Sequence, residues 1–198
     1  MLSKAERTKL FIIEKAAPIF NTKGYSATSM TDILAATGMA KGGIYGNFKN
    51  KDEIALEAFE YSFNKMREAL RFVLKQQNTS AGKLIAILDF YHDYSIKPVI
   101  MGGCPLLNTA IDVDDTLPFL KEAAAKGLKE MLGTLKHIIE QGIKYGEFGK
   151  KLDASNEAEL FFAAIEGGIM MSKLIDNPEI LNRLLENMKQ QIKQRFKK

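Results

Sequence analysis

Residues Ser29 to Phe48 read SMTDILAATGMAKGGIYGNF, and this stretch decides the fold of the N-terminal part of the chain. Thr28 or Ser29 can cap a short helix, and Asp32 follows Ser29 at the spacing of a capping box. Gly38 suits the end of that helix, so a second short helix is expected over about 40–47. Two short helices joined by such a turn predict a helix-turn-helix, whose second helix enters the major groove of DNA.

Three glycines crowd the second short helix at positions 42, 43 and 46. Each glycine inside a helix costs about 0.5–1 kcal/mol relative to alanine, so a functional reason is expected. One interpretation is that the helix backbone lies close to DNA. The alternative is tight packing of Gly42 and Gly43 against the first helix.

The predicted DNA contacts include a charged side chain, a long side chain with a hydroxyl, and backbone N–H groups. Lys41 brings positive charge to the groove, and the Tyr45 hydroxyl can reach a phosphate. Lys51 begins the next helix, where N–H groups also favour a phosphate. With few long side chains available, Asn47, Lys41 and DNA shape are expected to share base recognition. The predicted set is Thr28, Ser29, Lys41, Gly42, Gly43, Tyr45, Asn47 and Lys51.

Composition fits an ordinary globular chain of 198 residues, with 46% hydrophobic and 26% charged residues. No apolar run is long enough for a membrane span, no secretory leader is visible, and there is one cysteine, so a cytoplasmic location is expected. The first 53 residues carry eight Lys/Arg and five Asp/Glu, which is most of the net charge of +4. A basic N-terminal part is typical of proteins that bind a polyanion, and a merely solvated surface is the alternative.

Nearly every segment has helical periodicity, so an all-α fold of about nine helices is predicted. We expect a three-helix DNA-binding domain over 1–52 and a larger helical body over 53–198. The first helix is expected to end at Lys23, before Gly24. The predicted helices cover about 3–23, 30–37, 40–47, 51–77, 80–95, 104–111, 117–145, 155–174 and 178–196.

The stretch GYSATSMTDILAATGMAKGGIYGNFKNKDEIALEAF, residues 24–59, resembles the DNA-binding head of TetR-family transcriptional regulators. The resemblance covers about the first sixty residues. It implies a homodimer that binds a palindromic operator, with a C-terminal domain for ligand binding and dimerisation. The shared residues are Gly24, Tyr25, Thr28, Ser29, Met30, Asp32, Ile33, Gly38, Ile44, Tyr45, Phe48, Lys51 and Asp52.

Two late helices are expected to form the dimer interface that the resemblance implies. Gly167 and Gly168 inside a helix favour a close approach of two backbones, and an intrachain core is the alternative. The predicted interface residues are Gly167, Met171, Leu181, Leu184, Met188 and Ile192.

A small-molecule site is expected in the body, because such sites are mostly apolar cavities with a few polar groups. The candidates are Tyr91, His92, Cys104, Asn108, Phe161, Phe162, Glu166 and Met170, and each could instead be core or surface. Cys104 precedes Pro105 and so lies near a helix N-terminus, where the pKa of a thiol is lowered. Its GGCP corner resembles that of an electrophile-responsive TetR subgroup. The alternative for Cys104 is a small buried apolar residue.

An enzyme is the main different class of protein to consider. The chain has two histidines, His92 and His137, and no zinc or nucleotide-binding motif. We therefore predict no catalytic residue, no metal site and no cofactor. The sequence favours a repressor that a small-molecule or thiol-reactive effector releases from its operator. A DNA-binding protein without a ligand is the second alternative.

Overall fold

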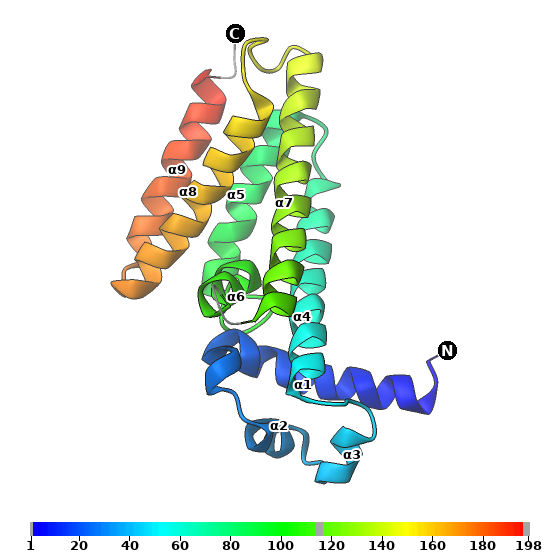
Figure 1. The fold of residues 1–198 in the computed structure, drawn as a ribbon. Coiled ribbons are helices and arrows are strands. Elements are labelled where there is room, and N and C mark those ends of the chain that lie inside the picture. The colour runs from blue at the N-terminus through cyan, green and yellow to red at the C-terminus, as the bar shows by residue number, and fades with distance from the viewer. Residues whose placement is uncertain (1, 114–116, 196–198) are drawn as a thin grey trace. The chain divides into compact units, whose positions relative to one another are not determined.

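The computed structural model describes residues 2–113 and 117–195, apart from the Arg195 side chain. Within these residues the fold is all-α, with nine helices and no strand (Figure 1). The helices are α1 (Lys4–Ala27), α2 (Met30–Thr37), α3 (Lys41–Tyr45), α4 (Lys51–Leu74), α5 (Ser80–Ile96), α6 (Pro105–Asp112), α7 (Pro118–Lys144), α8 (Ala154–Leu174) and α9 (Pro178–Arg195).

Local sequence signals explain where most of these helices begin. Three of them start at a proline, which lacks the N–H that a first helical residue would leave unpaired. Ser29, Thr79 and Asp153 cap α2, α5 and α8 by accepting hydrogen bonds from N–H groups of the first turn. The all-α fold is confirmed, and the predicted end of the last helix at residue 196 lies outside the described residues.

Two helix ends differ from the sequence-based expectation. Gly24 adopts φ 78°, as expected for a residue that stops a helix, but one further helical turn follows it and α1 continues to Ala27. This extra turn is held by hydrogen bonds with Lys51 and Asp112, which lie far from it in the sequence, so its own residues did not indicate it. The second difference is at the C-terminal end of α4, which stops at Leu74 rather than near Gln77.

The chain divides into two compact units, and the first comprises Met1–Arg67 and Pro98–Gly127. In it, α1 packs against α2 and α6. Helices α1 to α4 share a small buried apolar core, which fixes the helix-turn-helix. Ile33, Ile44 and Phe48 belong to it, and Met39 packs against it. The full core is Ile12, Ile13, Ala16, Ile33, Ile44, Phe48 and Ile54.

The second unit comprises Glu68–Lys97 and Leu128–Lys198. In it, α9 packs against α8 and α5. The Glu147 carboxylate accepts hydrogen bonds from the N–H groups of Ser80 and Ala81, each at 2.9 Å, and so joins the α7–α8 loop to the start of α5. Lys189 of α9 makes an ion pair with Asp89 of α5 at 2.6 Å. Hydrogen bonds to Asp89 and Glu186 raise the pKa of Lys189 although burial lowers it.

Among the described residues, none of the helices has the length and apolar character that a membrane crossing requires.

Candidate nucleic-acid interface

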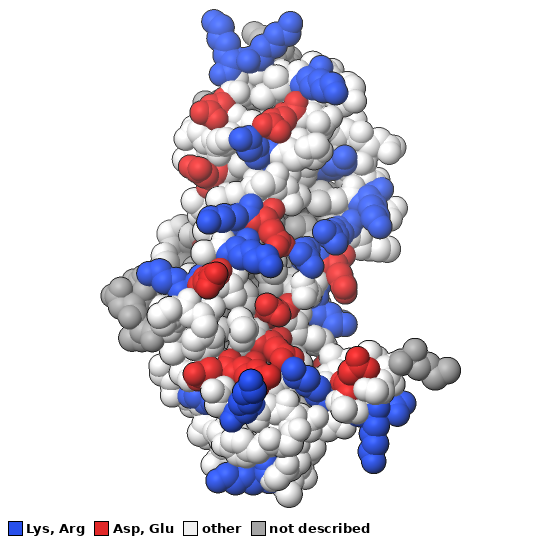
Figure 2. All heavy atoms as spheres, turned by 45° about the vertical axis from the view of Figure 1, so that its right-hand side comes forward, with Lys and Arg blue, Asp and Glu red and all other residues white. Residues whose placement is uncertain are grey.

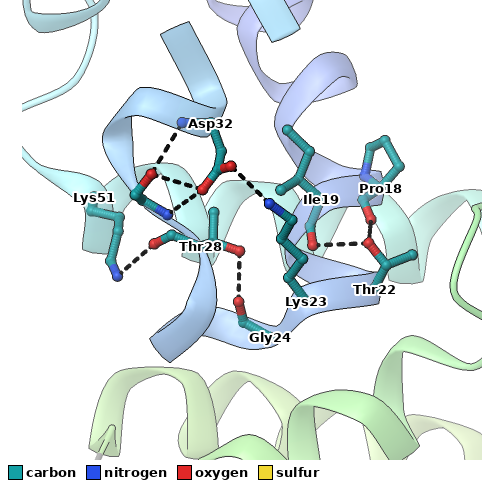
Figure 3. A network of polar contacts seen from close by, with 9 residues as sticks. Pro18, Ile19, Thr22, Lys23, Gly24, Thr28, Asp32 and Lys51 are labelled. Carbon is teal, nitrogen blue, oxygen red and sulfur yellow. Dashed lines mark hydrogen bonds and ion pairs between the residues drawn. The ribbon is translucent and has the colours of Figure 1, made fainter. Parts of the chain in front are cut away.

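The start of α2 is held by a complete capping box. The Ser29 hydroxyl accepts from the Asp32 N–H at 3.1 Å, and the Asp32 carboxylate accepts from the Ser29 N–H at 2.8 Å (Figure 3). Lys23 of α1 makes an ion pair with the same carboxylate at 2.7 Å. The hydrogen bond from Lys23, together with those from Ser29, holds the pKa of Asp32 well below its usual value. The capping prediction for Ser29 is confirmed, and the ion pair joins α1 to α2.

The turn between α2 and α3 depends on Gly38. This residue adopts the left-handed conformation, with φ 66°, and its N–H donates to the Leu34 carbonyl at 2.9 Å. A glycine accepts this backbone without the steric cost that a side chain adds. Ile44 is the fully buried residue of α3 and packs into the same core as Ile33. The apolar side of α3 therefore faces inward, and its remaining residues are available to a partner.

The exposed side of α3 carries Lys41, Gly42 and Tyr45. Tyr45 is 43% exposed, and the Lys41 ammonium lies 5.7 Å from the centroid of its ring. A Cβ added at Gly42 would meet nothing within 4 Å, so tight packing against the first helix does not explain this glycine. At Gly43 the near contact is the flexible end of Met39, at 2.9 Å. The surface beside Gly42 is open to close approach from outside the chain.

The side chains of three other predicted DNA contacts make hydrogen bonds within the chain. The Thr28 side chain is buried and its hydroxyl donates to the Gly24 carbonyl at 2.6 Å. The Asn47 amide donates to the Gly43 carbonyl at 2.8 Å. The Lys51 ammonium donates to two carbonyls of the turn that follows Gly24. These bonds give the three residues structural tasks, and their contact with DNA stays a prediction.

On the face that Figure 2 presents, charge does not gather into one uniform basic band. Figure 2 shows Lys and Arg interspersed with Asp and Glu over the face that it presents. On α1, for example, Lys9 makes ion pairs with Glu53 and Glu57 of α4, and the hydrogen bond with Glu57 raises the pKa of Lys9.

The predicted ligand residues fall into both units. Tyr91 and Phe162 belong to the second unit, where both are buried and their ring centroids lie 6.4 Å apart. The Phe90 ring packs edge-on against Tyr91 with centroids 5.5 Å apart, and the tilted Tyr94 ring lies 6.5 Å from Tyr91. The rings are therefore brought together as one aromatic cluster, in which Phe90 is half-buried and the other rings are buried; we call Phe90, Tyr91, Tyr94 and Phe162 the buried aromatic cluster.

The remaining candidates of the second unit are more accessible. His92 is partly exposed, and its Nδ1 lies 3.1 Å from the Asp93 carboxylate. Phe161 and Glu166 are half-buried, and Met170 is exposed. Their participation in a ligand site stays a prediction.

Cys104 and Asn108 belong to the first unit. Cys104 is the N-cap residue of α6, as expected, but its side chain is only 1% exposed. The Asn108 amide donates to the carbonyls of Asn21 and Gly102, at 2.9 and 3.0 Å, and to the Asn21 side chain at 3.1 Å. These bonds fasten α6 and its preceding corner to α1. They give Asn108 a structural task, and its contact with a ligand stays a prediction.

Asn21 is a residue that the sequence analysis missed. Its amide donates to the carbonyls of Met101 and Gly103, at 2.9 and 2.8 Å. A signal was available, because Asn21 follows Ala17 at the four-residue spacing of a helix face that is otherwise apolar. A polar residue at such a position needs a partner when it is buried.

A cavity of about 30 Å³ lies within the first unit. Parts of α1, α4, α6 and α7 line it, including Asn21, Tyr25, Ser62, Asn108 and Asp112. That volume holds a few water molecules at most, and ligand sites are roughly ten times larger. Within the described residues, no group of three or more His, Cys, Asp or Glu side chains is placed to hold a metal ion.

The predicted dimer residues differ in how far they are buried within the chain. Leu181 and Ile192 are buried within the chain, so little of either side chain is left for a partner subunit to contact. Leu184 lies against Gly168 of the neighbouring helix, and Met188 is half-buried. Gly167 has open space beside it, and Met171 is exposed.

Two family models match the chain. Residues 12–58 match the model described as bacterial regulatory proteins of the tetR family. Residues 80–188 match the model described as a tetracyclin repressor-like C-terminal domain. The two matches therefore cover both the helix-turn-helix and most of the following helices.

Three similar proteins show how far the likeness extends. The crystal structure of a TetR-family transcriptional regulator from Cytophaga hutchinsonii is 37% identical, with a TM-score of 0.93, over 100% of this chain and 99% of that one. The HTH-type transcriptional repressor DhaR from Mycobacterium sp. strain GP1 is 21% identical over 88% of this chain and 86% of its own length. FadR from Bacillus subtilis, in complex with stearoyl-CoA, is 22% identical, with a TM-score of 0.72, over 89% of this chain and 95% of that one.

Proposed function

The chain belongs to the TetR family of transcriptional regulators, which are not enzymes, and we propose that it is a homodimeric repressor released from a palindromic operator by an effector. The observation that carries this proposal is the exposed side of α3, where Lys41, Gly42 and Tyr45 face solvent above a buried core. A rigid helix with an open backbone suits the major groove, and Lys41 supplies a charge for phosphate. The similar protein DhaR is itself named a repressor.

The proposed dimer uses one face of α8. Leu160, Gly167, Met171 and Leu174 repeat at helical spacing, and Leu160 and Leu174 are 58% and 81% exposed. Contiguous exposed apolar surface is a feature of protein–protein interaction sites. The interface proposed here keeps Gly167 and Met171 and leaves out Leu181 and Ile192, which the chain buries itself. Two-fold symmetry would then match the symmetry of a palindromic operator.

We assign DNA binding to residues 1–52 and effector binding and dimerisation to residues 53–198. The buried aromatic cluster supports an apolar effector, because ligand pockets are lined mainly by apolar and aromatic side chains. The complex of FadR with stearoyl-CoA makes long-chain acyl-CoA the first probe to try. A thiol-reactive effector is the competing class. It would need α6 to move first, because Cys104 is buried.

The test begins with selection of a binding site from random double-stranded DNA by the full chain. Operator affinity and the mass of the complex are then measured at fixed salt. A palindromic site bound by two protomers supports the proposal, whereas selection of no preferred sequence contradicts it. Salt must be stated because phosphate contacts make affinity strongly salt-dependent.

The effector classes are separated on the same operator. Stearoyl-CoA and a thiol-reactive electrophile are added to wild type and to Cys104→Ser. Release by the electrophile in wild type alone would support a cysteine switch. Release by stearoyl-CoA in both proteins would support a reversible apolar effector. A complex that resists both reagents would favour the alternative of a DNA-binding protein without a ligand.

A further inference from the structure

The last turn of α1 connects the first helix to the helix-turn-helix. It runs from Tyr25 to Thr28, after the backbone changes direction at Gly24. The Thr28 N–H donates to the Tyr25 carbonyl at 3.3 Å, which closes the turn. Ser29, which caps α2, is the next residue along the chain. The orientation of this turn therefore sets where α2 begins, and through α2 where α3 lies.

A carboxylate holds the N–H end of the turn. Asp112, the last residue of α6, accepts a hydrogen bond from the Tyr25 N–H. The fit is close, because a Cβ at Gly24 would lie 2.9 Å from an Asp112 carboxylate oxygen. Glycine at 24 thus permits both the backbone change and the approach of α6.

An ammonium holds the C=O end of the same turn. Lys51 Nζ lies 2.9 Å from the Tyr25 carbonyl oxygen and 2.9 Å from the Thr28 carbonyl oxygen. It also lies 3.9 Å from the centroid of the Tyr25 ring, whose hydroxyl donates to Asp52. Figure 3 shows the Lys51 side chain directed at Thr28. A negative group at the N–H end and a positive group at the C=O end both match the dipole of a helical turn.

We propose that Asp112 and Lys51 form a charge clamp on residues 25–28, and that both are positioning residues for operator binding. The proposal rests on the proposed function, since operator affinity is what the clamp serves. Lys51 directs its ammonium to two carbonyls and acts on DNA through the turn. Asp112 brings the end of α6 to the same turn, so operator affinity depends on where α6 lies.

Charge alone predicts the opposite result for Asp112. Removing a negative charge from a DNA-binding protein raises its affinity for a polyanion by ordinary electrostatics. The clamp instead predicts that Asp112→Asn lowers operator affinity, because the turn loses the charge at its N–H end. The sign of this one change distinguishes the two explanations.

The salt dependence of binding distinguishes positioning from phosphate contact. Each phosphate that a lysine neutralises contributes about 0.9 to the slope of log affinity against log salt. Operator affinity is measured over a salt series for Lys51→Gln, Asp112→Asn and the control Lys41→Gln. We expect Lys41→Gln to reduce the slope by about one. We expect Lys51→Gln and Asp112→Asn to lower affinity about tenfold at every salt concentration, with the slope unchanged. A loss of slope in Lys51→Gln equal to that of the control, or unchanged or raised affinity in Asp112→Asn, would overturn the proposal.

Hydrogen exchange of the free protein tests the clamp without DNA. Amide exchange over residues 24–37 is followed in the same three variants, after circular dichroism has verified their helix content. The clamp predicts faster exchange there in Lys51→Gln and Asp112→Asn, and wild-type exchange in Lys41→Gln. Equal exchange in all four proteins would overturn it. If wild type selects no operator, the proposed function fails and the exchange result still decides the clamp.

Discussion

Two glycine pairs that look alike in the sequence do opposite things in the structure. Gly42 of the Gly42-Gly43 pair lies in α3 with nothing within 4 Å of an added Cβ. Gly102 of the Gly102-Gly103 pair, before α6, has φ 106° and would place a Cβ 2.5 Å from the Asn21 carbonyl oxygen. The first pair leaves a surface open, and the second closes a corner onto α1. A repeated sequence pattern therefore carries no single meaning, and the neighbours of each glycine decide its role.

The largest effect is expected on the free energy of unfolding when Gly102, which packs against α1, is replaced. Gly102→Ala adds strain from the positive φ and a clash with backbone that cannot turn aside. We expect it to lower the free energy of unfolding by about 2–4 kcal/mol, measured by urea denaturation. Gly133→Ala in α7 is the matched control, because its surroundings are open and its φ is not positive. That variant should gain about 0.5–1 kcal/mol through helix propensity. Equal stability of the two variants would remove the distinction between packed and open glycines.

The role of Gly42 is tested by measuring operator affinity rather than stability. Gly42→Ala should fold at least as stably as wild type, because alanine favours helix and meets no neighbour. If DNA approaches this backbone, the added methyl group should weaken operator binding about tenfold, or about 1.4 kcal/mol. Fluorescence anisotropy with the selected operator measures this change. Affinity within twofold of wild type would show that the glycine serves another purpose.

In a third pair, Gly167-Gly168 in α8, one glycine is closely packed and the other has open space beside it. A Cβ at Gly168 would lie 2.7 Å from the Leu184 side chain, whereas Gly167 meets nothing within 4 Å of the same chain. Gly168→Ala should cost about 1 kcal/mol of unfolding free energy. Gly167→Ala should instead weaken the proposed dimer, as measured by sedimentation equilibrium. A dimer that Gly167→Ala leaves unchanged would move the interface away from this face of α8.

At neutral pH the smallest effect is expected from the turn at residues 25–28, because its pH-linked contribution changes only at high pH. Burial, with the hydrogen bond to Asp52, raises the pKa of Tyr25 to about 12, above the ordinary value of 10. The neutral phenol is thus favoured in the folded state, and this stabilisation is complete below pH 10 and is lost as the pH rises towards 12. The stability of wild type relative to Tyr25→Phe should fall over this window. A relative stability that stays constant from pH 9 to pH 12 would contradict the assignment.

The sequence determined most helix positions and the class of the protein. Ser29 with Asp32, Gly38, and the prolines at 105, 118 and 178 each act within a few residues, so their effects are readable without a structure. The same local reading also placed Cys104 correctly at the start of α6.

Only the tertiary structure decided which residues hold the DNA-binding part in place. Asp112 and Tyr25 are separated by 87 positions, as are Asn108 and Asn21. Such pairs exist because the folded chain brings α6 against α1, and no periodicity or capping rule encodes that approach. Lys51, predicted from the sequence as a phosphate contact, also donates to two carbonyls that lie 26 and 23 positions earlier in the chain. Local hydrogen bonds fix where helices start and stop, whereas burial and long-range pairing fix what each exposed or charged residue is able to do.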